Sequence, residues 1–312
     1  MSDHVIIYSV RRNREFVGTG ELAQEIGRIG RRQDGGTYQA DIILSDEDYP
    51  VEQELMSGKG VPVTSCMDEV KNFCFFISPR LSSLDTAEKL INEYKKTLAY
   101  SQGKRISVED VNRYLLENNA VTENEGRLVP TYINSLSVKH YLSVSDISCL
   151  INNFISIDDA NGWEDDAAIA WGLGNLDVTK VMIYSPSFDG LHNEYLQVLP
   201  CLYPVKDTQS HLCAAWWGLL GNGEASGFGH IKTWLRTELW GKLKDILETS
   251  IGYKAREHLS LLDKRIMRSI PRQLIPFFKD DSMTKAKASL LFNLGYHDCE
   301  DAKDFDFDGY SE

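Results

Sequence analysis

The first eighty residues contain short apolar runs of the kind that form β-strands. β-branched and other apolar residues fill positions 5–10, 38–44 and 72–78, the last run reading NFCFFIS. Gly35-Gly36 and Ser57-Gly58 supply turn residues between these runs. We therefore predict three strands in this part of the chain.

From about residue 84 the spacing of apolar positions becomes helical. Each predicted helix combines an apolar stripe at a period near 3.6 with a start or stop signal, such as the Ser-x-x-Asp cap at Ser107 or the stop at Gly295. These helices cover residues 86–99, 107–118, 145–155, 164–173, 208–220, 230–250, 253–270 and 282–294. One later strand is predicted at 178–184, where the sequence reads VTKVMIY.

The order of these elements predicts an α+β protein. A strand-containing N-terminal part is followed by a predominantly helical C-terminal part. A division into residues 1–130 and 131–312 fits this change, although 312 residues can also form one large domain.

Charge is distributed unevenly along the chain. The net charge is −13, yet residues 232–272 contain ten Lys and Arg against five acids and so carry +5, leaving −18 on the rest. Residues 140–179 contain seven acids and no Lys or Arg. Residues 298–312 contain seven acids and one lysine. Such asymmetry bears on binding partners more than on fold.

Several classes of protein are disfavoured by composition. No apolar run approaches the roughly 18 residues of a membrane span, and the N-terminus lacks the basic and apolar regions of a signal peptide. The six cysteines have neither metal-ligand nor redox spacing, so we expect reduced thiols. The expectation is a cytoplasmic, soluble protein with no membrane partner, no metal and no cofactor.

A glycine-rich loop precedes the basic region. Its glycines leave backbone N–H groups uncovered just before a predicted helix, an arrangement that can hold a phosphate. They are Gly221, Gly223, Gly227 and Gly229. Glu224 inside the loop opposes this interpretation, and a flexible connection between helices is the alternative.

The basic region itself contains two rows of residues at i+4 spacing. Cations interleaved with an aromatic ring can neutralise phosphates and stack on a base. The first row is Lys232, Arg236, Trp240 and Lys244, and the second is Lys264, Arg268 and Arg272. A solvated helical face with i,i+4 ion pairs is the alternative interpretation of both rows.

Three other segments allow more specific chemistry. Cys66 follows a short apolar segment and would act as a nucleophile if a histidine lay within hydrogen-bond reach. Residues 158–166 (DDANGWEDD) lack oxygen donors at the first and twelfth positions of an EF-hand, so a loop leading into a helix is favoured over a cation site. Residues 18–23 fit a loose dinucleotide fingerprint, but the segment before them is too charged for a central strand.

The placement of charge favours a non-enzymatic protein. We expect it to self-associate, or to bind a protein partner, and to hold a polyanion, such as single-stranded RNA, in a locally basic helical groove. This organisation resembles that of nucleocapsid proteins by analogy of architecture only. The alternatives are an α/β enzyme with Cys66 as nucleophile and an acidic inhibitor or immunity-type protein that covers a basic partner site.

Overall fold

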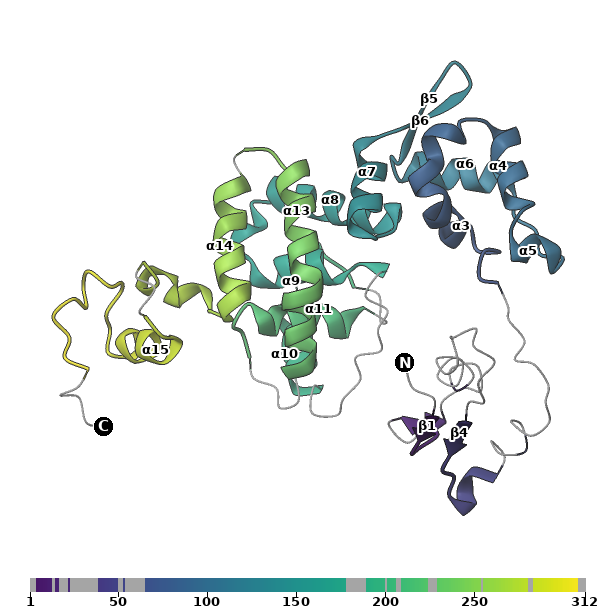
Figure 1. Cartoon of the computed structure of the whole chain (residues 1–312). Coiled ribbons are helices and arrows are strands. Elements are labelled where there is room, and N and C mark those ends of the chain that lie inside the picture. The colour runs from purple at the N-terminus through teal and green to yellow at the C-terminus, as the bar shows by residue number, and fades with distance from the viewer. Residues whose placement is uncertain are drawn as a thin grey trace. The chain divides into compact units, whose positions relative to one another are not determined.

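The chain divides into two compact units, described here from a computed structural model (Figure 1). Unit 1 is Met1–Ser65 and unit 2 is Cys66–Glu312. The structure describes residues 4–12, 15–16, 22, 39–49, 53, 65–177, 189–199, 201–205, 209–223, 229–253, 255–279 and 283–307. This division lies well before the predicted one near residue 130. The predicted strand at 178–184 lies outside the described residues.

Unit 1 is organised by a two-stranded parallel sheet. Strand β1 (His4–Ile7) pairs with β4 (Gln39–Ile42), so that Ile7 lies beside Ile42. A short antiparallel pair follows β1, made by β2 (Arg11–Arg12) and β3 (Glu15–Phe16). A 3-10 turn, η1 (Asp46–Asp48), follows β4. The described core of this unit is small, with Val10 and Leu22 buried against the sheet residues. Strands β1 and β4 confirm the first two predicted strands.

Unit 2 begins with a helix where a strand was predicted. Residues 70–77 form α3 (Val70–Ile77), which buries Phe73, Cys74 and Ile77 and leaves Phe75 and Phe76 each 40% exposed. The prediction of a strand was wrong because a short apolar run fits a buried strand and a buried helix equally well. The buried residues Phe73, Cys74 and Ile77 are spaced i, i+1 and i+4, as on one face of a helix.

The next helices begin at their sequence caps, but residues 86–99, predicted as one helix, form two helices because Thr97 caps a new one. A 3-10 segment, η2 (Ser78–Ser83), leads to α4 (Ala87–Tyr94), α5 (Leu98–Ser101) and α6 (Val108–Glu117). Side chains of Thr86, Thr97 and Ser107 accept the backbone N–H groups that open these helices. A β-hairpin that was not predicted then forms between β5 (Val121–Asn124) and β6 (Arg127–Pro130), turning through Glu125 and Gly126 at positive φ.

A layer of helices forms the main core of unit 2. It contains α7 (Tyr132–His140), α8 (Val144–Asp159), the 3-10 turn η3 (Gly162–Glu164), α9 (Asp166–Gly174), α10 (Asp189–Val198) and α11 (Ser210–Leu219). The backbones of α9 and α11 approach closely, because a Cβ on Gly174 would lie 2.6 Å from the Cα atom of Cys213. Both helices are apolar on most sides and are buried, as such helices must be.

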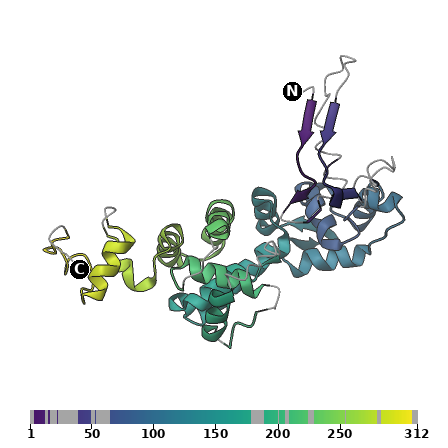
Figure 2. The same cartoon turned by 90° about the horizontal axis from the view of Figure 1, so that it is seen from below.

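The basic region forms the next two long helical segments. Helix α12 (Gly229–Trp234) continues through a π-helical turn, η6 (Leu235–Leu239), into α13 (Trp240–Ser250). Helix α14 (Ala255–Arg268) returns beside α13, and the two lie side by side in Figure 1 and are seen nearly end-on in Figure 2. Their apolar stripes join the main core through residues such as Leu243, Ile246 and Ile266.

The C-terminal segment packs around a small core of its own. A 3-10 segment, η7 (Arg272–Phe277), is followed by α15 (Lys285–Asn293), which Thr284 caps and which Gly295 follows at φ +92°. Phe305 and Phe307 of the acidic tail pack against this core, and Lys287 lies over the Phe307 ring. The protein is therefore α+β with few, short strands and a predominantly helical C-terminal part. Within the described residues, no helix is both long and apolar enough to cross a membrane.

Candidate functional site

The π-helical turn divides the first predicted basic row into two. One additional residue per turn rotates everything beyond it by about 100° relative to an uninterrupted α-helix. Trp240, which follows this turn, is only 2% exposed and packs edge-on against Trp216. Its Nε1–H donates to Asp263 at 2.7 Å. Trp240 was expected to stack on a base, and in this conformation its buried ring cannot do so.

Lys244, the last member of that row, is held by acids. Its Nζ lies 2.7 Å from Asp263 and 3.7 Å from Glu248. The hydrogen bond to Asp263 raises the pKa of Lys244 against a smaller opposing effect of burial. The charge of Lys244 is therefore matched within the protein, and the alternative of an ion-paired helical face describes this end of the row.

The other end of the row is different, because cations gather there. Arg236 and Lys285, which opens α15, each lie near enough to Lys232 for their charges to act on it, and we call these three residues the Lys232 cluster. Burial first, and then the charges of Arg236 and Lys285, lower the pKa of Lys232. Within the described part of the chain, no carboxylate lies within ion-pair distance of Lys232 or Lys285.

Arg236 is positioned by neutral groups. Its Nε–H donates to the carbonyl oxygen of Ile266 at 3.1 Å, and one terminal nitrogen donates to the Ser269 hydroxyl at 2.8 Å. These contacts fix the guanidinium against α14 without neutralising it. The Lys232 cluster thus presents three positive charges from two helices.

The second predicted row is also divided. Lys264 and Arg268 lie on one side of α14, where Arg268 lies over the Phe278 ring at 5.8 Å. Lys264 and Lys279 border a cavity of about 200 Å³ that Phe278 helps to line, and we call it the Phe278 pocket. A hydrogen bond from the Asp301 amide and the charge of Lys279 lower the pKa of Asp298, so that acid lies near one rim.

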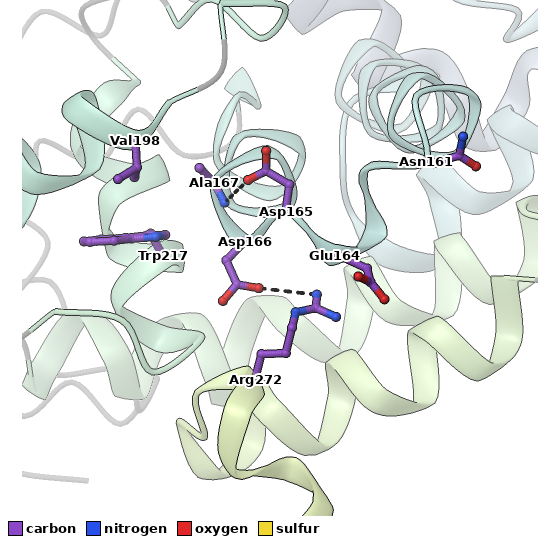
Figure 3. A pocket seen from close by; sticks show the side chains of 8 residues that line it. All are labelled: Asn161, Glu164, Asp165, Asp166, Ala167, Val198, Trp217 and Arg272. Carbon is purple, nitrogen blue, oxygen red and sulfur yellow. Dashed lines mark hydrogen bonds and ion pairs between the residues drawn. The ribbon is translucent and has the colours of Figure 1, made fainter. Parts of the chain in front are cut away.

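Arg272, the third member of this row, belongs to a buried ion-pair network. Arg265 is 1% exposed and contacts both carboxylate oxygens of Asp166, at 2.6 and 2.5 Å. Asn222 donates to the same carboxylate at 2.7 Å. Arg272 lies 3.5 Å from it, and a dashed line in Figure 3 marks this ion pair. Burial alone would raise the pKa of Asp166, but Arg265, Asn222 and Arg272 together outweigh burial and hold that pKa below its ordinary value.

An open pocket of about 540 Å³ borders this network (Figure 3). Glu164, Asp165 and Asp166 line it together with Trp217. Asp165 accepts the backbone N–H groups of Ala167 and Ala168 at the start of α9, as expected for acids in a first helical turn. The charged residues of the wall are acidic apart from Arg272, so its chemistry opposes an anion.

The described part of the glycine-rich loop serves packing. Gly221 has φ +97°, and a Cβ there would lie 2.3 Å from the backbone nitrogen of Pro271. Gly223 has φ +65° and lies beside the Glu194 carboxylate, which disfavours a phosphate. Gly229 opens the short helix α12, while Gly227 lies outside the described residues.

Cys66 is exposed at the start of unit 2. Its carbonyl oxygen accepts the side-chain amide of Asn72 at 3.0 Å. Among the described residues, no histidine hydrogen-bonds its thiol. No described group of three His, Cys, Asp or Glu side chains could hold a metal ion.

Comparisons with known proteins leave these features as the evidence for function. No protein-family model matches the chain, and no curated protein is significantly similar to it in sequence.

Sequence reasoning found Lys232, Arg236, Lys264 and Arg268 but missed Lys279 and Lys285. The spacing Lys285-x-Lys287 after a helix-capping threonine was visible in the sequence. The proximity of Lys285 to Lys232 depends on tertiary packing and was not visible in the sequence.

Proposed function

We propose that this protein is a non-enzymatic binding protein that holds a polyanion, such as RNA, against the Lys232 cluster, and that it self-associates. The observation that carries the proposal is the gathering of three cations with no described carboxylate beside the two lysines. Lys244, Arg265 and Arg272 of the same region, by contrast, each have an acid partner.

Lys232 is repelled by the two other cations of its cluster. Like charges held close together disfavour one another, which is why the pKa of Lys232 is lowered by its neighbours as well as by burial. A bound phosphate chain would relieve this repulsion and release its own condensed counterions. The net charge of −13 does not prevent this, because exposed charges separated by more than about 8 Å are largely screened at physiological salt.

Self-association is supported by the sheet of unit 1. Within the described residues, β1 and β4 pair only with each other, and one face exposes Ile6 at 45% and Ile43 at 49%. Parallel strands are normally covered on both faces. A second copy of the same sheet would cover these isoleucines with a matching apolar face.

The proposal is tested by binding of the full chain to a fluorescent single-stranded RNA and to inorganic polyphosphate, followed by anisotropy. Charge reversal at Lys232 and Lys285 should weaken binding to both ligands. Cys66→Ala should leave binding unchanged. If Cys66→Ala abolished an activity while the Lys232 cluster proved dispensable, the enzyme alternative would replace this proposal.

For self-association, light scattering should give a mass above that of a monomer. Ile43→Lys, which places a charge on the exposed sheet face, should return the chain to a monomer. A native chain that is already monomeric at the concentrations of the binding assay would refute this part of the proposal.

A further inference from the structure

The Phe278 pocket combines an apolar interior with a basic rim. Its walls come from α14 and from the segment around η7, and they consist mainly of Leu261, Ile270, Ile275, Pro276 and Phe278. Its volume of about 200 Å³ is below the roughly 300 to 1,000 Å³ of sites for drug-sized ligands. The pocket therefore has room for one small ring system rather than for a larger organic ligand.

The rim determines which ring would be favoured. Lys264 and Lys279 are exposed at the mouth, and neither has a carboxylate within ion-pair distance among the described residues. Asp298 lies farther from Lys279, near enough for the two charges to interact. Arg268 lies over the Phe278 ring. A ligand that places a flat apolar group inside and a negative charge outside would satisfy both parts of the site, since cations at a mouth attract phosphate and an aromatic wall stacks on a base.

We propose that the Phe278 pocket receives a single unstacked nucleobase, so that the polyanion bound by this protein is single-stranded nucleic acid. This inference rests on the proposed function and narrows its ligand class. A base can enter only if it is free of its neighbours, which excludes a duplex. Polyphosphate and sulfated polysaccharides provide the charge but no planar apolar ring.

Three ligands separate polyanion binding, which is the proposed function, from nucleobase binding, which is this inference. They are a single-stranded RNA, an abasic chain of equal length and inorganic polyphosphate. The affinity of the full-length protein for each ligand is measured. The RNA should bind about five- to 150-fold more tightly than the abasic chain, the range expected for stacking one base. Polyphosphate should bind with an affinity close to that of the abasic chain.

Two variants locate the effect. Phe278→Ala should remove the preference for RNA over the abasic chain, but Phe278 also packs against the C-terminal core, so the variant can lose its fold. Leu261→Trp provides the second test, because it fills the pocket from α14 and leaves Lys264 and Lys279 in place. It should abolish the preference for bases while polyphosphate binding stays unchanged.

Each outcome bears on the inference. Equal binding of RNA and the abasic chain by the native protein would overturn the inference and leave the proposed function intact. A preference for bases that survives Leu261→Trp would place base binding elsewhere and also overturn it. Binding to none of the three ligands would refute the proposed function as well, and a preference for anionic lipid vesicles over all three would replace nucleic acid with a membrane surface.

Discussion

Removing the two lysines of the Lys232 cluster should change how steeply binding depends on salt. Each phosphate contact with single-stranded nucleic acid contributes about −0.7 to the slope of log affinity against log salt concentration. The three cations brought together by α12, η6 and α15 therefore contribute a slope of about −2. Between 50 and 200 mM salt this amounts to an affinity loss of about 18-fold from the cluster alone.

The double variant Lys232→Gln, Lys285→Gln leaves only Arg236 of the cluster. The part of the affinity loss that comes from the cluster should then be about threefold over the same salt range, and the measured slope should become less steep by about 1.4. Any contribution of Lys264 and Lys279 is common to both proteins and cancels in the comparison. The assay is anisotropy of a fluorescent single-stranded RNA titrated with the full chain at four or more salt concentrations.

A matched control separates local contacts from net charge. Lys89→Gln, Lys96→Gln makes the same change in net charge, but these lysines are already paired with Asp85 at 2.5 Å and Glu93 at 2.9 Å. The control should keep the native slope. If the two double variants changed the slope equally, or if neither changed it, the argument from the Lys232 cluster would be wrong.

Other predictions concern the buried network and the helix contacts. Arg265→Met leaves Asp166 charged and two carbonyl oxygens unpaired, so urea unfolding should show a loss of about 3–5 kcal/mol, against less than about 1 kcal/mol for the exposed Arg113→Met. Because folding lowers the pKa of Asp166, its contribution is present above about pH 4 and is lost as the pH falls further, so the native chain should lose stability there more steeply than Asp166→Asn. Gly174→Ala would place a Cβ 2.6 Å from the Cys213 backbone and should destabilise by about 1–3 kcal/mol; Gly172→Ala, which meets only side chains, should cost less.

Local signals in the sequence predicted most helices because each signal acts over a few residues. Ser107 and Thr284 cap the helices that follow them, and the apolar stripe of residues 230–250 does form one long helical segment. Where the local signal was ambiguous, as in the apolar run of α3, the strand prediction was wrong. Tertiary packing selected the helix.

The site was predictable only in part. The spacing of Lys232 and Arg236 could be read directly, but the π-helical turn that redirects Trp240 could not. Residues 140–179, which contain acids but no Lys or Arg, also form ion pairs with the basic residues 232–272. Asp166 from the first segment pairs with Arg265 and Arg272 from the second. Part of the charge asymmetry in the sequence is thus neutralised inside the fold, and that pairing depends on contacts about a hundred residues apart.

The most direct test of the account is whether the full chain carries nucleic acid when it is purified without nuclease. The measurement is the ratio of absorbance at 260 and 280 nm together with the mass by light scattering. We expect a raised ratio and a mass above that of a monomer, with the ratio reduced in the Lys232→Gln, Lys285→Gln variant. A clean monomer that has no nucleic acid bound and does not bind added RNA would contradict the central claim.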